Sequence, residues 1–139
     1  MLTIDRDRLA RGLDELGAIS QEAPPVVTRV VFTEADLRGR AFAKRLRAEA
    51  GLRVREDAMG NAFARWEGAE PALPAVATGS HIDAIPNAGR FDGSVGVLGG
   101  LEAIRALQRA GFRPRRSIEP VIFTSEEPTA LGLAAWEAA

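Results

Sequence analysis

The 139-residue sequence contains no cysteine and no tyrosine, and it has a single histidine, His81. Without cysteine the chain forms neither a disulfide scaffold nor a thiolate zinc site, and it has no cysteine nucleophile. Any chemistry that requires an imidazole must use His81. A strong charge of one sign is also missing, because 18 Lys and Arg residues face 19 Asp and Glu residues, for a net charge of −1. This balance argues against a general binder of nucleic acid or of acidic membranes.

Long hydrophobic runs are missing as well. No segment reaches the roughly 18 consecutive apolar residues that a membrane span requires. The charged segment 1–11 also lacks the apolar stretch of a secretory signal. We therefore expect a cytoplasmic protein that binds neither membranes nor nucleic acid. The length fits one domain, and a composition of 46% hydrophobic and 27% charged residues is typical of a globular fold.

Hydrophobic spacing and end signals predict three helices. The first spans 5–20, where leucines recur at helical spacing. Thr33 has the features of an N-cap for a second helix that runs to about Ala50, and Gly51 supplies the left-handed residue that ends it. A third helix spans 93–110, with apolar side chains on one face.

Four short strands are expected around these helices. Segments 52–56 and 62–66 flank a turn-rich link. Segment 75–79 is apolar or small throughout, as a buried strand is, and 118–124 follows the third helix. Strand, helix and strand in this order make a βαβ unit, in which the crossover is right-handed and the two strands are parallel. The expected fold class is therefore α/β.

Polar side chains converge at one edge of this βαβ unit. In a parallel α/β sheet, ligands bind outside the carboxyl ends of the strands. The first strand runs into His81 and Asp83, and the second runs into Glu126 and Glu127. The loop before the connecting helix holds Asp92. No other part of the sequence gathers acid and imidazole in this way, so this edge is the candidate site.

These residue types suit metal-assisted hydrolysis. His81 offers one ring nitrogen to a metal ion, and Asp83, two residues further in an extended segment, can hold the other ring nitrogen. Asp92 has two oxygens and can bridge two cations about 3.5–4 Å apart. Glu126 and Glu127 are adjacent and face opposite ways in an extended backbone, so one can bind a metal while the other accepts a proton. Nitrogen and oxygen ligands without thiolate suit Zn²⁺ or Mn²⁺.

Competing motifs fail on spacing. The glycines between 93 and 100 do not form the G-x-G-x-x-G dinucleotide fingerprint, and no G-x-x-x-x-G-K-[ST] phosphate loop is present. Ser94 does not lie in a G-x-S-x-G nucleophile turn. The link 57–61 is interpreted as a structural turn.

Four stretches of the sequence resemble one enzyme family. They are TGSHID at 78–83, PNAGRFDG at 86–93, FTSEEPT at 123–129 and the upstream DAMGN at 57–61. Their order and spacing are similar to those of the di-zinc amidohydrolases of the allantoate amidohydrolase and N-carbamoyl-L-amino-acid hydrolase (hydantoinase-carbamoylase) group. This group belongs with the aminoacylase and carboxypeptidase-type metallopeptidases. The resemblance covers nearly the whole chain up to residue 129.

The resemblance implies a role for each candidate residue. His81 and Glu127 would each bind one of two Zn²⁺ ions, with Mn²⁺ as the alternative metal, and Asp92 would bridge the two ions. Glu126 would be the general base, and Asp83 would orient His81. The implied fold is a partial three-layer sandwich, a mainly parallel sheet flanked by helices, as in di-zinc aminopeptidase-like catalytic domains. The implied reaction is hydrolysis of a carbamoyl, ureido or related non-peptide C–N bond in a small-molecule substrate.

The resemblance also implies that residues 1–139 are the N-terminal part of a metallohydrolase catalytic domain. After residue 129 the family pattern is not followed. The later histidine ligands, the C-terminal catalytic part and the lid domain that forms the homodimer in full-length members are absent from the sequence. His81, Asp92 and Glu127 provide about half of the protein ligands that two zinc ions need. We therefore expect the 139 residues alone to be inactive or nearly so.

Two other interpretations remain open. The chain can be a small non-catalytic α/β module that binds a metal or a partner subunit, or it can be an aminoacylase or dipeptidase of the same superfamily. Zinc binding by the native chain and by His81→Ala would separate a used metal site from an inherited motif. We also expect strand 118–124 to have lost neighbours from the sheet, which would expose a sheet edge and apolar surface and favour association.

Overall fold

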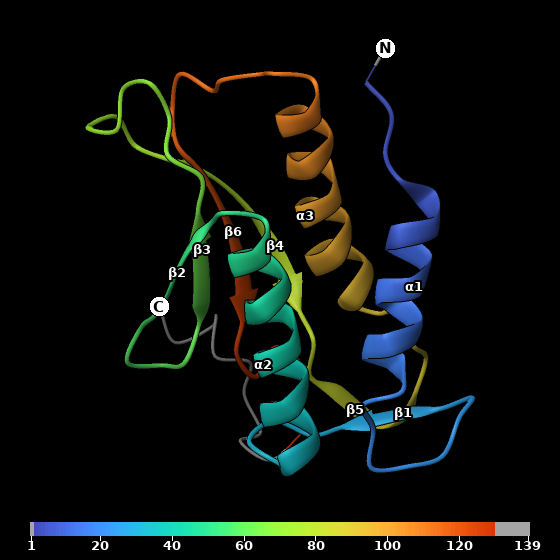
Figure 1. The fold of residues 1–139 in the computed structure, drawn as a ribbon. Coiled ribbons are helices and arrows are strands. Elements are labelled where there is room, and N and C mark those ends of the chain that lie inside the picture. Colours follow the sequence, from blue (N-terminus) through green and yellow to red (C-terminus); the bar gives the residue numbers. More distant parts are fainter. Residues whose placement is uncertain (1, 130–139) are drawn as a thin grey trace.

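The structure of the protein is a computed structural model, and it describes residues 2–129 (Figure 1). Its elements are, in order, α1 (Arg6–Gly17), β1 (Val27–Arg29), α2 (Glu34–Glu49), β2 (Arg53–Glu56), β3 (Ala62–Arg65), β4 (Val76–His81), β5 (Ala84–Ala88), α3 (Ser94–Arg109) and β6 (Ile118–Phe123). Every predicted helix and strand is present, with its ends within three residues of the expected positions. The α/β class is confirmed. The departure from the family pattern after residue 129 lies outside the described residues.

Local sequence accounts for the ends of the helices. Thr33 caps α2, and its hydroxyl accepts a hydrogen bond from the backbone N–H of Asp36 at 3.4 Å. Gly51 follows the same helix with a φ of 77°, a conformation that favours glycine. Asp5 caps α1 by accepting a hydrogen bond from the backbone N–H of Arg8 at 2.9 Å. Within residues 2–129 no helix is both long and apolar enough to cross a membrane.

Four strands form a mixed sheet in the order β2-β3-β6-β4. β4 and β6 are parallel and α3 connects them, so the predicted βαβ unit is confirmed. The pairs β2–β3 and β3–β6 are antiparallel. The expectation of a mainly parallel sheet is therefore wrong for the described residues. The reason is that β2 and β3 are joined by a short turn, and a short turn can join only antiparallel strands.

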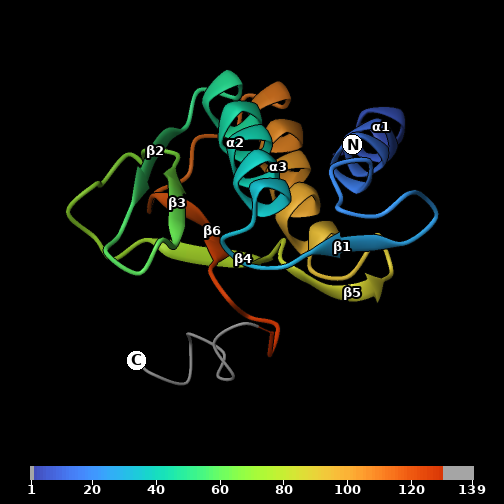
Figure 2. The same cartoon turned by 90° about the horizontal axis from the view of Figure 1, so that it is seen from below.

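The three helices lie on the same side of the strands (Figure 2). α2 and α3 cover the four-stranded sheet, and α1 lies beside α3. Two clusters of buried apolar side chains fill the space between these layers, one around Leu16, Ile82 and Ile122 and the other around Leu52 and Leu101. Residues 2–129 thus supply a sheet layer and one helix layer of the expected sandwich, and no described helix covers the other face of the sheet.

A second, two-stranded sheet is not predicted by the sequence pattern. In it β1 pairs antiparallel with β5. The backbone N–H of Asn87 donates to Oγ1 of Thr28 at 2.9 Å and reinforces this pair. A strand of three residues has too little periodicity to be recognised in a sequence. This small sheet fixes the path of the chain between β4 and α3, where Asp83 and Asp92 lie.

The position of β6 differs from expectation. β6 lies between β3 and β4, so it has a neighbour on each side. The prediction that segment 118–124 has lost neighbours and forms an exposed sheet edge is therefore wrong, because the β2–β3 hairpin pairs with it. Among the described strands of this sheet, the edge positions belong to β2 and β4.

Candidate metal centre

The carboxyl ends of β4 and β6 and the start of α3 meet at one edge of the four-stranded sheet. β4 ends at His81 and β6 ends at Phe123, and these residues are partners across the parallel pair. Asp83 follows β4 by two residues, Glu126 follows β6 by three, and Asp92 precedes α3 by two. The predicted convergence of three separate stretches is therefore what the structure shows.

His81 lies at the centre of this group, and its side chain is 8% exposed. Its Nδ1–H donates to the backbone carbonyl oxygen of Asp83 at 3.0 Å, since a carbonyl oxygen can only accept. On the other side of the ring, Nε2 lies 3.3 Å from Oε2 of Glu126 and 3.9 Å from Oδ1 of Asp92. The imidazole therefore presents Nε2 to the carboxylates.

The carboxylate of Asp83 is buried between the two strand ends. Its Oδ2 accepts a hydrogen bond from the backbone N–H of Glu127 at 3.0 Å. Its Oδ1 lies 3.5 Å from Nδ1 of His81 and has no hydrogen-bond partner among the described residues. The ring is thus held by the backbone carbonyl of Asp83, while the carboxylate stands next to the ring and anchors the neighbouring loop.

Both glutamates approach His81. One ligand atom each from His81, Glu126 and Glu127 lies within 4.8 Å of the others, and this is the one group of three among the described residues that could hold a metal ion. The expectation that Glu126 and Glu127 face opposite ways is wrong. Ser125 has a φ of 57°, so the backbone leaves the extended conformation directly before the two glutamates.

Asp92 reaches the site from its rim. Its side chain is 66% exposed, and it is not part of the three-residue group. The next residue, Gly93, has a φ of 59°, and a Cβ atom there would lie 2.6 Å from Nε2 of His81. Only glycine therefore lets the start of α3 come this close to the imidazole.

The electrostatics of the site favour a cation. Burial alone would lower the pKa of His81, but the adjacent carboxylate and backbone carbonyl of Asp83 and the charge of Glu126 raise that pKa to about 9. Burial and the nearby charge of Asp92 raise the pKa of Glu127. Imidazole nitrogen and carboxylate oxygen are ligands that divalent metals accept, and a positive ion here would offset the repulsion among the carboxylates. The residues present therefore fit a metal ion.

An open cavity of about 390 Å³ adjoins the imidazole, and it is lined by Gly79, Ser80, His81, Phe123 and Glu126. Its volume lies in the range that accommodates small-molecule ligands, roughly 300–1,000 Å³. Glu126 and His81 contribute polar groups to the wall, and Phe123 contributes an apolar one. A small molecule in this cavity would lie against the side chain of Glu126.

Arg29 supports the site, although the sequence pattern does not single it out. Its side chain is buried, with the residue 1% exposed. Nε donates to the carbonyl oxygen of Ile82 at 2.7 Å, and Nη1 donates to the carbonyl oxygens of Leu16 and Ile19 at 2.6 and 2.7 Å. Arg29 thereby ties the end of α1 to the segment between His81 and Asp83. A lone arginine in a short strand gives no sequence signal for this role.

The chain is similar to known hydrolases. Residues 61–137 match peptidase family M28. Over 132 residues the chain is 56% identical to ureidoglycolate hydrolase from Arabidopsis thaliana. The aligned region covers 95% of this chain and 28% of that protein. Over 126 residues it is 39% identical to N-carbamoyl-L-amino-acid amidohydrolase from Pseudomonas sp. (strain NS671). This aligned region covers 91% of this chain and 30% of that protein.

The fold is also similar to a solved structure. A hydantoinase/carbamoylase family amidase from Burkholderia ambifaria superimposes with a TM-score of 0.89 at 41% identity, covering 92% of this chain and 32% of that one. These relatives confirm the resemblance drawn from the sequence motifs. The chain spans about 30% of the length of the relatives that it matches.

Proposed function

The chain belongs to peptidase family M28, and on that premise we propose that its metal centre forms part of the active site of a hydrolase that cleaves non-peptide C–N bonds. The proposed substrates are N-carbamoyl amino acids, ureido compounds and allantoate-type molecules. The observation that carries this proposal is the approach of His81, Glu126 and Glu127 to within 4.8 Å at the strand ends. The names of the relatives, ureidoglycolate hydrolase and N-carbamoyl-L-amino-acid amidohydrolase, support the substrate class.

Zn²⁺ is the proposed metal, with two ions in a complete site and Mn²⁺ as the alternative. The donor set of imidazole and carboxylates without thiolate suits both metals. In this proposal His81 and Glu127 would each hold one ion, and Asp92, at the rim of the site, would offer its carboxylate to both. Together they supply about half of the protein ligands that two zinc ions need. The remaining ligands come from outside the described residues.

Glu126 is the proposed general base. A bound metal supplies Lewis acidity and lowers the pKa of a water molecule towards about 7. Glu126 faces the cavity, accepts the proton of the attacking water and returns it to the departing nitrogen. The backbone carbonyl of Asp83 holds one proton of His81 on Nδ1, so Nε2 is the ring nitrogen that would give up its proton and bind the metal. Addition of one water to an N-carbamoyl amino acid then yields the amino acid, carbon dioxide and ammonia.

The activity is best tested in a chimera. Residues 1–129 replace the matching segment of the ureidoglycolate hydrolase from Arabidopsis thaliana, to which the chain is 56% identical. Ammonia release is measured with ureidoglycolate and with N-carbamoyl-L-amino acids. We expect the chimera to release ammonia. Glu126→Gln should lower the rate of ammonia release by about 10²-fold or more, because the general base is removed. Glu22→Gln, at an exposed glutamate outside the proposed ligand set, is the matched control.

Two outcomes would contradict the proposal. A folded chimera that binds zinc but hydrolyses none of these substrates would favour a non-catalytic metal-binding module. A chimera that cleaves dipeptides or N-acyl amino acids instead would favour an aminoacylase or dipeptidase.

The 139-residue chain alone is expected to show no measurable turnover, because it lacks part of the ligand set. We further propose that residues 1–139 are the N-terminal part of a catalytic domain in a cytoplasmic protein that is homodimeric at full length.

A further inference from the structure

The turn that carries the two glutamates is strained at Ser125. This turn, residues 124–127, follows β6 directly, and Ser125 adopts a φ of 57° although it is not glycine. Thr124 and Ser125 are both buried. A conformation of this kind persists only where the surrounding structure holds it in place. The contacts that hold it therefore decide where Glu126 and Glu127 lie.

Asn61 makes one of these contacts. The backbone pairs between β3 and β6 end at Ala62 and Ile122. Beyond that point, Oδ1 of Asn61 accepts a hydrogen bond from the backbone N–H of Thr124 at 2.9 Å. The side chain of Asn61 thus takes the place of a backbone acceptor. It extends the hydrogen bonding between β3 and β6 to Thr124, where the turn begins.

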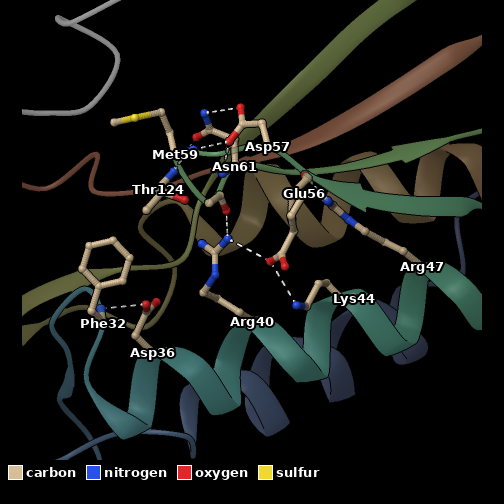
Figure 3. A network of polar contacts seen from close by, with 12 residues as sticks. Phe32, Asp36, Arg40, Lys44, Arg47, Glu56, Asp57, Met59, Asn61 and Thr124 are labelled. Carbon is tan, nitrogen blue, oxygen red and sulfur yellow. Dashed lines mark hydrogen bonds and ion pairs between the residues drawn. The ribbon is translucent and has the colours of Figure 1, made fainter.

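The orientation of Asn61 is fixed by Asp57, as Figure 3 shows. Nδ2 of Asn61 donates to Oδ2 of Asp57 at 3.0 Å, so Oδ1 must face Thr124. The other carboxylate oxygen of Asp57 accepts from the backbone N–H groups of Met59 and Asn61 at 3.0 and 2.9 Å. Asp57 and Asn61 therefore act as one hydrogen-bonded unit.

The turn that contains Asn61 is itself anchored to α2. The buried side chain of Arg40 donates to the carbonyl oxygen of Gly60 and lies 3.4 Å from Oε1 of Glu56 (Figure 3). Lys44 donates to the same oxygen of Glu56 at 3.0 Å. Because α2 packs on the core, these bonds give the turn a fixed position from which Asn61 can hold the end of β6.

We propose that Asn61 is a positioning residue of the metal centre, which sets the turn 124–127 so that Glu126 and Glu127 face His81. Asn61 holds the start of this turn at Thr124, and Asp83 holds its end through the N–H of Glu127. The inference rests on the proposed function, because that function gives the two carboxylates their roles. The link 57–61 is thus more than a structural turn.

The test uses reversal of the Asp57–Asn61 pair. Asn61→Asp keeps an acceptor for Thr124, but it loses the donor to Asp57 and places two carboxylates in contact. The double variant Asp57→Asn/Asn61→Asp restores one donor and one acceptor in the reverse order. Met59→Ala, at an exposed side chain of the same turn, is the matched control. Far-UV circular dichroism checks that each variant is folded.

Two readouts are measured on the 139-residue chain. The first is the set of backbone amide resonances of residues 125–127 in the metal-free protein. The second is Zn²⁺ affinity by calorimetry. We expect Asn61→Asp to shift these resonances and to weaken Zn²⁺ binding about tenfold, a size typical of groups that orient metal ligands. The double variant restores both properties, and Met59→Ala changes neither.

The inference is overturned if Asn61→Asp leaves the resonances of 125–127 in place or if the double variant fails to restore them. Should Asn61→Asp not fold, amide hydrogen exchange in the native chain decides the question. The N–H of Thr124 is expected to be protected although it lies beyond the β3–β6 backbone pairs, and fast exchange there would refute the contact. If the native chain binds no Zn²⁺, the proposed metal centre fails, whereas the amide readouts still report on Asn61.

Discussion

The backbone N–H of Glu127 donates to Oδ2 of Asp83 at 3.0 Å. Asp83 follows β4 and Glu127 follows β6, so this bond joins the two strand ends on which the proposed metal centre is built. The same residue holds the imidazole of His81 through its backbone carbonyl. Asp83 therefore orients two proposed metal ligands at once, one through its main chain and one through its side chain.

Removing the carboxylate of Asp83 should weaken metal binding. Asp83→Ala is expected to lower Zn²⁺ affinity by about 10–100-fold, as loss of an outer hydrogen-bonding partner does. Asp83→Asn keeps an oxygen that can accept from Glu127, so its effect should be smaller. Calorimetric titration of the 139-residue chain measures both, with the exposed Asp14→Asn as control. Equal affinities of Asp83→Ala and the native chain would contradict this role.

Acid should destabilise the fold through Glu102. Its side chain is 2% exposed and accepts hydrogen bonds from Arg8 at 2.8 and 2.7 Å and from the backbone N–H of Asp5 at 3.0 Å. Burial alone would raise the pKa of Glu102, but these bonds and the charge of Arg8 outweigh it and lower that pKa below its ordinary value of 4.5. Ionised Glu102 therefore stabilises the folded state fully above pH 4.5. This contribution to the free energy of unfolding is lost as the pH falls from 4.5 through the lower pKa that Glu102 has in the folded protein.

The measurement for Glu102 is urea unfolding over a series of acidic pH values. Glu102→Gln should be less stable than the native chain at neutral pH and should lose less stability on acidification, because its side chain does not titrate. Glu22→Gln, at an exposed position, should follow the native curve. Parallel curves for Glu102→Gln and the native chain would show that this carboxylate does not contribute to the pH dependence.

Replacing Arg29 with lysine should destabilise the fold. Its guanidinium donates to three carbonyl oxygens in a buried place, whereas an ammonium group on a flexible stem cannot match that geometry. Each buried acceptor left without a partner costs about 1–3 kcal/mol, so Arg29→Lys should lower the free energy of unfolding by a few kcal/mol. Chemical denaturation followed by circular dichroism gives the value. Arg38→Lys, on the exposed face of α2, should change it by less than about 0.5 kcal/mol.

The edge of the four-stranded sheet should promote association of the 139-residue chain. β4 has a partner on one side only within residues 2–129, and Val76 at its start is exposed. An edge strand with exposed apolar side chains is a template for pairing with another chain. Light scattering should show a mass that rises with concentration, and Val76→Lys should reduce the rise. Leu37→Lys, at an exposed site on α2, is the control, and a monomer at every concentration would refute the prediction.

Much of the fold and of the site follows from local features of the chain. Leucine spacing, the cap at Thr33 and the glycine at 51 place the helices, since these signals act over a few residues. The βαβ order by itself also places His81, Asp92 and Glu127 at one sheet edge. Local pattern thereby indicated the fold class, the candidate residues and the family resemblance.

Contacts between distant segments decided the rest. The mixed order of the sheet and the interior place of β6 depend on the pairing of the β2–β3 hairpin with a strand more than fifty residues away. The common direction of Glu126 and Glu127 depends on the turn at Ser125, which Asn61 holds across 63 residues. Arg29 reaches Ile82 across 53 residues. No local pattern encodes such contacts, because they exist only once the core has brought these segments together.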